Sequence, residues 1–182
     1  MSDKEHELPL TQFLLGLQQK QDRGALAALR SGVGRPPGES TRMFPYVARF
    51  LKGAGADSPQ VQAVFLTASL FASHPSHAGV GSLGASLRMA VKAKHGEDGV
   101  SARLTSTLDA DPEDLPRRLT ELVGLCESAS VPLDWNRFYR DSLSLLSEDD
   151  DRRNKTRLHW ARDFWGYSQD EAQTTEPQEN KP

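Results

Sequence analysis

Apolar residues recur every three or four positions along most of this chain, a spacing that places them on one face of an α-helix. A long alternation of apolar and polar residues, which is typical of a half-buried strand, is missing. The periodic segments predict helices over residues 10–17, 23–30, 45–52, 59–72, 83–94, 103–108, 112–128, 135–146 and 152–165. The sequence therefore predicts an all-α fold.

Several of these segments begin with residues that satisfy free backbone N–H groups. Asp22, Ser82 and Asp134 each stand one position before a periodic segment, where a side-chain oxygen accepts hydrogen bonds from the first helical turn. Ser58 stands in the same position before Pro59, and proline suits the first turn because it lacks an N–H group. We therefore expect helices to begin at these four places.

The composition changes between Gly96 and Gly99, from rich in alanine and glycine to rich in aspartate and glutamate. We expect a short linker there, joining two small helical bundles over residues 8–97 and 98–168. The last residues, 169–182, are polar and contain few groups that could be buried, which predicts a disordered tail.

The net charge of −3 conceals an uneven distribution. Residues 8–96 hold ten bases and three acids, a net charge of +7, whereas residues 97–170 hold ten bases and sixteen acids, a net charge of −6. A basic half attracts anionic partners such as nucleic acid. Opposite charges on the two halves would equally suit head-to-tail docking of two copies, so both interpretations stay open at this point.

The residue content argues against several classes of protein. Residues 1–7 are polar and acidic, without the basic and apolar regions of a signal peptide. The longest apolar stretch, residues 63–72, is too short to span a membrane, so no membrane partner is expected. Cys126 is the one cysteine, which excludes a disulfide framework and favours a cytoplasmic location.

No motif typical of an active site or a metal site is found, so we expect a noncatalytic protein without a cofactor or metal. His74 and His77 flank a proline without further ligands nearby, which favours a polar loop over a zinc site. The carboxylates of residues 148–151 would diverge on a helix, so they suit the start of the final helix better than a cation site.

The final predicted helix, residues 152–165, combines bases with aromatic residues. On a helical wheel, the side expected to face the core contains Leu158, Ala161 and Trp165 beside Trp160 and Phe164. Arg153 and Arg157 lie in line with the last two of these aromatic residues. They could face a phosphate backbone, or they could lay their aliphatic stems over the edge of the core with their heads in water.

Two further bases, Arg88 and Lys92, are expected on the outward face of the helix over residues 83–94. They stand four residues apart and would repel each other on an isolated helix. Phosphate groups would relieve this repulsion, which favours a nucleic-acid contact. A solvated basic face explains the same pattern equally well.

The order of several short motifs along the chain is more informative than any one of them. The series runs Gln19-x-x-Asp-Arg-Gly-Ala-Leu-Ala-Ala-Leu-Arg30, Phe44-Pro-Tyr-Val-Ala-Arg49, Ser82-Leu-Gly84, Pro116-Arg-Arg-Leu119, Leu133-Asp-Trp135 and Arg157-Leu-His-Trp-Ala-Arg-Asp-Phe164. It resembles the CasB family, the small subunits of the type I-E CRISPR surveillance complex, Cascade. The resemblance covers residues 10 to 166 and implies two helical bundles, no enzymatic activity, and a pair of subunits joined head to tail.

The resemblance also implies partners and a site. The partners are the other Cascade subunits with their crRNA, a second copy of the chain, and the target DNA with its displaced strand in the R-loop. The basic positions that match the family are Arg30, Arg49, Arg103, Arg117, Arg118, Arg152 and Arg153. The helical wheels add Arg88, Lys92 and Arg157 as nucleic-acid-binding candidates. The main alternative is a helical protein-interaction adaptor that does not bind nucleic acid.

Overall fold

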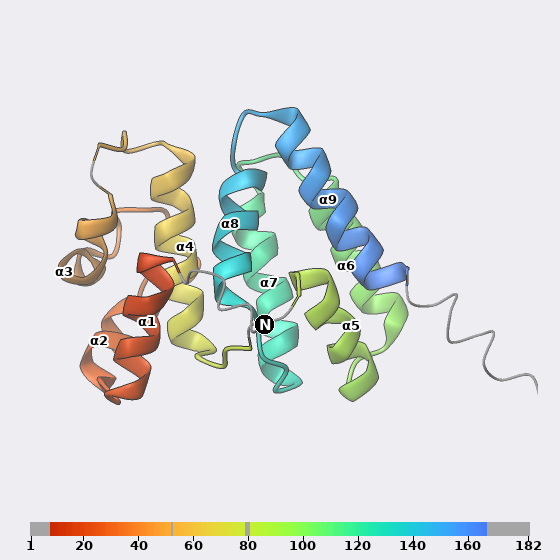
Figure 1. The fold of residues 1–182 in the computed structure, drawn as a ribbon, viewed down its shortest axis with the longest axis horizontal. Coiled ribbons are helices and arrows are strands. Elements are labelled where there is room, and N and C mark those ends of the chain that lie inside the picture. Colours follow the sequence, from red (N-terminus) through yellow and green to blue (C-terminus); the bar gives the residue numbers. More distant parts are fainter. Residues whose placement is uncertain (1–7, 52, 79–80, 167–182) are drawn as a thin grey trace, which may run out of the picture.

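The computed structural model describes residues 8–51, 53–78 and 81–166, and within these ranges the secondary structure is helical (Figure 1). The α-helices are α1 (Pro9–Gln19), α2 (Arg23–Arg30), α3 (Phe44–Val47), α4 (Pro59–Ser73), α5 (Leu83–Ala93), α6 (Glu97–Leu108), α7 (Leu115–Ser128), α8 (Trp135–Leu145) and α9 (Asp150–Trp165). The 3-10 helices η1 (Thr41–Met43) and η2 (Ala48–Phe50) flank α3. The predicted all-α class is confirmed, whereas the predicted tail, residues 169–182, lies outside the described residues.

The four predicted capping residues act as caps. The Asp22 carboxylate accepts a hydrogen bond from the N–H of Ala25 (2.9 Å), and that of Asp134 accepts one from Arg137 (2.9 Å). The Ser58 and Ser82 hydroxyls accept from the third residue of α4 and α5, at 3.3 and 3.5 Å. These contacts depend only on neighbouring residues, which explains why the sequence located them.

Three of the predicted helices differ from the structure by three residues or more at one end. The helix expected over residues 103–108 begins at Glu97, because Glu97 and Asp98 in its first turn suit the positive end of a helix dipole. The segment expected as a linker therefore opens α6. The helix expected over residues 45–52 is α-helical only over α3, and α7 begins at Leu115 rather than at Pro112.

Helix α4 lies at the centre of the molecule, between α1 and α2 on one side and α8 on the other (Figure 1). Most of its side chains are buried, including Val64, Ala68 and Phe71, so apolar residues surround it rather than forming one stripe. Phe71 contacts Trp135 of α8 edge to face, with 5.6 Å between ring centroids. The buried side chains of all these helices form one continuous hydrophobic core.

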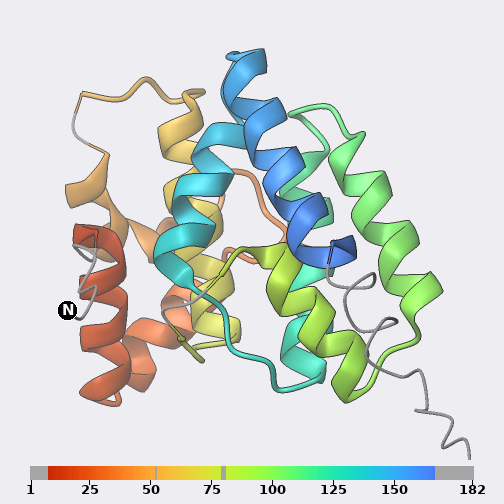
Figure 2. The same ribbon diagram turned by 45° about the vertical axis from the view of Figure 1, so that its right-hand side comes forward.

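Helix α5 precedes the predicted boundary at residues 96–99 but packs mainly on α9 and α7 (Figure 2). A close approach of two backbones makes this possible: a Cβ atom on Gly84 would lie 2.3 Å from the carbonyl oxygen of Trp160. The Ser82 hydroxyl also donates to the Asp163 carboxylate at 2.6 Å. The predicted boundary therefore does not coincide with a gap in the packing, and two separate folding units stay a prediction.

The histidine segment after α4 pairs with the chain before α8. His74 is buried, and its Nε2 lies 2.7 Å from the carbonyl oxygen of Val131. His77 forms an isolated parallel bridge with Leu133, and its Nδ1 accepts the backbone N–H of Trp135 at 3.3 Å. The two histidines thus hold backbone segments that are more than fifty residues apart in the sequence. The segment that the sequence predicts as a polar loop therefore joins the end of α4 to the chain before α8.

The buried face of α9 differs from the one predicted. Trp160 and Phe164 are fully buried, and Thr156 completes their line one turn earlier. Leu158, expected on the same face, is 57% exposed. The predicted apolar face of α9 was too wide, because α5 and α8 cover only the part of it that contains Trp160 and Phe164.

Candidate nucleic-acid interface

The ten bases predicted to bind nucleic acid lie on six elements of the fold. Arg30 lies on α2, Arg49 on η2, Arg88 and Lys92 on α5, and Arg103 on α6. Arg117 and Arg118 open α7, and Arg152, Arg153 and Arg157 lie on α9. The partners of these side chains divide them into groups with different capacities to bind a phosphate.

Cations of α7 and of the start of α9 are paired with carboxylates. Arg117 contacts Glu121 at 2.8 Å, and both Arg117 and Arg118 lie 3.9 Å from Asp114. Arg152 pairs with Asp149 at 3.3 Å, and Arg153 pairs with Asp150. Each of these carboxylates lies three or four residues from its arginine on the same helix or helix start. Such surface pairs contribute roughly 0–1 kcal/mol, so a phosphate could replace them at small cost.

Arg153 and Arg157 lie along the edge of the core. Arg157 donates to the carbonyl oxygen of Ala110 at 3.3 Å, and Arg153 donates to that of Ser147 at 3.4 Å. The Nε atom of each is buried without a hydrogen-bond partner among the described residues. The aliphatic stems of these two arginines cover the core, and their guanidinium groups donate hydrogen bonds to backbone carbonyls. Both contacts would have to break before either side chain could bind a phosphate.

Two predicted bases, Arg88 and Arg103, also have partners on or near their own helices. The side chain of Arg88 is 13% exposed and pairs with Glu97 at 3.0 Å, so it does not point outward as the wheel suggested. Arg103 donates to the carbonyl oxygen of Gly99 at 3.0 Å. Lys92 is exposed on the same helix as Arg88. The repulsion expected between Arg88 and Lys92 is weakened because Glu97 neutralises Arg88.

The cations of the first quarter of the chain are held differently. Arg30 donates two hydrogen bonds, at 3.0 and 2.7 Å, to the carbonyl oxygen of Ala72 in the last turn of α4, where a positive charge suits the helix dipole. The guanidinium of Arg49 lies over the ring of Phe13, 4.6 Å from its centroid. Neither contact neutralises the positive charge.

No base in residues 8–51 has a carboxylate partner among the described residues. The set comprises Lys20, Arg23, Arg30, Arg35, Arg42 and Arg49. Every ion pair found in the described ranges lies between residues 88 and 163. Residues 8–51 contain only two acids, Asp22 and Glu39, and the first is used as a helix cap. A phosphate approaching this region meets cations that no carboxylate of the described residues neutralises.

Sequence reasoning selected only Arg30 and Arg49 from this set. Lys20, Arg23, Arg35 and Arg42 were missed because they lie at helix ends and in the 31–43 connection, where a helical wheel carries no information. The shortage of acids nearby was the available signal. On the rear half, Arg140, Lys155 and Arg162 also lack a partner among the described residues, but they lie within the acidic part of the chain.

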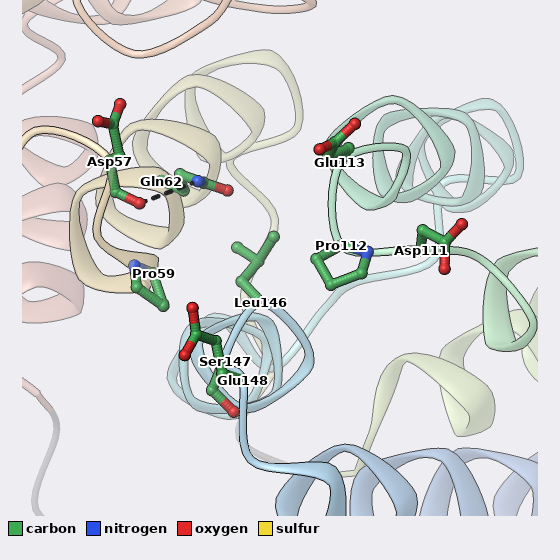
Figure 3. Close-up of a pocket in the computed structure, with 9 residues that line it drawn as sticks. All are labelled: Asp57, Pro59, Gln62, Asp111, Pro112, Glu113, Leu146, Ser147 and Glu148. Carbon is green, nitrogen blue, oxygen red and sulfur yellow. Dashed lines mark hydrogen bonds between the residues drawn. The ribbon is translucent and has the colours of Figure 1, made fainter.

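A pocket of about 720 Å³ with the opposite charge lies between the start of α4, the α6–α7 connection and the α8–α9 connection (Figure 3). Four carboxylate residues, Asp57, Asp111, Glu113 and Glu148, line it, and no base does. This concentration of negative charge disfavours a phosphate group. Within the described residues, no group of three His, Cys, Asp or Glu side chains is placed to hold a metal ion.

A helix that crosses a membrane must be long and largely apolar, and the described helices can be compared with this requirement. None of them combines the length and the apolar content that crossing a bilayer requires.

Comparison with known proteins identifies the family. The family described as CRISPR-associated protein Cse2 matches residues 25–165. The curated Cse2 protein of Thermus thermophilus is 30% identical over 149 residues, which cover 81% of this chain and 82% of that protein. The family match includes Arg30 of α2, the central helix α4 and all of α9.

Solved structures agree with this match. The crystal structure of a Cse2-family protein from Thermus thermophilus superposes with a TM-score of 0.73 at 30% identity, covering 91% of this chain and 99% of that one. A chain of a CRISPR RNA-guided surveillance complex shares the fold, with a TM-score of 0.70 at 23% identity over 92% of this chain and 99% of that one. A crystal structure named CasB, also from Thermus thermophilus, has a TM-score of 0.71 at 30% identity, with 91% and 99% coverage. This chain therefore belongs to the CRISPR-associated Cse2 family, also called CasB.

Proposed function

We propose that this protein is a noncatalytic small subunit of the type I-E CRISPR surveillance complex, Cascade. In this role it binds nucleic acid without reading its sequence, and it stabilises the target DNA and the displaced strand of the R-loop during antiviral defence in the cytoplasm. Its membership of the Cse2 family supports the assignment to the complex. The observation that carries the nucleic-acid part is the set of cations in residues 8–51 that have no carboxylate partner in the part of the chain that the structure describes.

The mechanism follows from the energetics of an R-loop. Formation of the RNA–DNA hybrid replaces a DNA duplex of similar stability, so modest protein contacts to a backbone can decide the balance. Cations spread over several helices contact phosphates without contacting base edges, which gives affinity without sequence preference. The partners in this proposal are the other Cascade subunits with crRNA, the target DNA with its displaced strand, and a second copy of the chain.

The ten predicted bases stay candidates for this interface, and we rank them by the partners and the burial of their side chains. Arg30 and Arg49 come first, because no carboxylate competes for their charge. Arg117 and Arg152 are exposed but paired, so they would exchange a carboxylate for a phosphate. Arg153 and Arg157 come last, because they are partly buried at the core edge with their Nε atoms enclosed, whereas Arg30 is exposed.

The test compares R-loop binding by crRNA-loaded Cascade with and without this subunit at several salt concentrations. We expect the subunit to tighten binding, with the greatest effect at low salt, because each phosphate contact to duplex DNA contributes a slope of about 0.9. A subunit that joins the complex and leaves R-loop stability unchanged at every salt concentration would refute the nucleic-acid role.

The acidic pocket and the ion pairs of the rear half favour a second candidate, a helical protein-interaction adaptor. This candidate predicts that charge reversal of the pocket residues Glu113 and Glu148 disrupts assembly, and that removal of Arg42 and Arg49 leaves DNA affinity unchanged. The nucleic-acid proposal predicts the reverse for the two arginines.

A further inference from the structure

Helix α3 lies at the outer edge of the molecule (Figure 1). Its first residue, Phe44, has an exposed aromatic ring. Phe44 is 42% exposed and is one of three large hydrophobic residues that are exposed in the described part of the chain. The other two, Met89 and Leu158, are aliphatic. Phe44 is therefore the exposed large hydrophobic residue that offers an aromatic surface to a ligand.

A contact with the core holds this ring in place. Phe44 meets Phe65 of α4 edge to face, with 6.2 Å between centroids and 89° between planes. Phe65 is 6% exposed, so it belongs to the core and anchors the exposed ring. An anchored aromatic ring loses little conformational freedom when a ligand stacks on it, which favours binding.

Cations flank the ring on both sides in the sequence. Arg42 of η1 is exposed and has no hydrogen-bond or carboxylate partner among the described residues. Arg49 of η2 is exposed and oriented by its contact with the ring of Phe13. The segment from η1 to η2, residues 41–50, contains no acid. It therefore combines an exposed aromatic ring with two exposed positive charges that have no carboxylate partner among the described residues.

We propose that Phe44 stacks an unpaired base of single-stranded nucleic acid, while Arg42 and Arg49 hold phosphates on either side of that base. Single-strand-binding surfaces combine aromatic platforms with cations, and every base has a face that can stack, so no sequence preference results. A duplex keeps its base faces covered and would use only the two cations. This inference rests on the proposed function and assigns the displaced strand, rather than the duplex, to this segment.

The experiment measures binding of the full chain to a single-stranded oligonucleotide and to a duplex of the same sequence, over a range of salt concentrations. Phe44→Leu removes the aromatic face but keeps an apolar side chain against Phe65. We expect roughly tenfold weaker single-strand binding, an unchanged salt slope, and unchanged duplex binding. Phe44→Tyr keeps the ring and should bind as the parent does.

In the same experiment, Arg42→Gln tests the contribution of a charged contact to a phosphate. It should flatten the single-strand salt slope by about 0.7, the value for one phosphate contact. Leu158→Ala is the matched control, because it shortens another exposed apolar side chain on α9 and should leave both affinities unchanged. Thermal unfolding of each variant verifies that the fold is retained.

The outcomes separate this inference from the proposed function. If the parent chain binds single strands with a salt slope and Phe44→Leu binds equally well, the stacking inference is overturned while the proposed function stands. If Phe44→Leu binds single strands normally but no longer joins Cascade, Phe44 is a protein contact and the inference is again overturned. If the parent chain binds neither single strands nor the R-loop in the assembled complex, the proposed function fails and the inference fails with it.

Discussion

Gly84 of α5 packs directly against the backbone of Trp160 in α9. A Cβ atom at position 84 would lie 2.3 Å from the carbonyl oxygen and 3.0 Å from the Cα atom of Trp160, closer than atoms of this kind approach. Only glycine permits this contact, and it lets α5 and α9 approach closely. The contact joins a helix of the basic half of the sequence to the last helix of the acidic half.

We expect Gly84→Ala to destabilise the protein by about 1–3 kcal/mol, because the clash involves a backbone that cannot rotate away. Gly124→Ala is the matched control: this glycine lies within α7, and a Cβ atom there meets nothing within 4 Å. The control should stabilise the protein by roughly 0.5–1 kcal/mol. Urea unfolding of both variants measures the difference, and equal shifts in the two would contradict the proposed close contact.

A second prediction concerns the buried carboxylate of Asp141. It accepts a hydrogen bond from Trp160 Nε1 at 2.6 Å and pairs with Arg137 at 2.9 Å. Burial raises the pKa of this carboxyl above its ordinary value of 3.8, and the two contacts only partly oppose the effect. The stability that Asp141 contributes is therefore complete below pH 3.8 and is lost as the pH rises through the pKa of the folded state.

Asp141→Asn tests this sign, because the amide keeps an oxygen for Trp160 and does not titrate. Relative to this variant, the parent protein should lose free energy of unfolding as the pH rises from below 3.8, and the difference should then become constant. Chemical denaturation at a series of pH values gives the difference. A parent protein that gains stability relative to the variant over that interval would show that the Arg137 pair outweighs burial.

The thiol of Cys126 should be unreactive in the folded protein. It is fully buried in α7, and burial raises its pKa from 9.0 to about 12. At pH 8 the thiolate fraction is therefore about one in ten thousand, rather than about a tenth at the unshifted pKa. We expect a thiol reagent to react much more slowly with the folded protein than in urea, because local unfolding must first expose the thiol. A native rate close to the rate in urea would contradict burial of this thiol.

Two double substitutions at the start of α7 should change the salt dependence of DNA binding in opposite directions. Replacement of Arg117 and Arg118 by alanine should weaken DNA binding evenly across sequences and flatten the salt slope, by about 0.9 for each phosphate that the protein no longer binds. Asp114→Asn together with Glu121→Gln removes the partners of Arg117 and should steepen the slope. Filter binding at several salt concentrations measures both. An unchanged slope in both double variants would remove Arg117 and Arg118 from the interface.

Much of the fold follows from short-range patterns. The starts of α2, α4, α5 and α8 were predicted from Asp22, Ser58, Ser82 and Asp134, because a cap involves atoms only three residues apart. The start of α6 was missed because Gly96 offers no side-chain cap, and the two acids after it resemble the beginning of an acidic linker. In a sequence, a glycine therefore indicates the start of a helix less clearly than a serine or an aspartate does.

The candidate interface was predicted less well, because its properties depend on distant residues. The wheel placed Arg157 correctly beside Trp160, but it could not show that Ala110 would accept a hydrogen bond from it. It also could not show that Glu97 would pair with Arg88, across the turn between α5 and α6. The unneutralised cation Arg42 lies in a short 3-10 segment, where the periodicity of an α-helix makes no prediction.

The sequence by itself determined the helical class, the places where helices begin, the excess of positive charge in the first half, and the series of motifs that resembles the CasB family. These properties depend on composition and on residues close together in the chain. The tertiary structure decided that Leu158 stays exposed while Trp160 is buried, and that several bases from Arg88 onward acquire carboxylate partners while, among the described residues, those before residue 52 do not. Burial and charge neutralisation depend on which surfaces meet in three dimensions, and no local pattern contains that information.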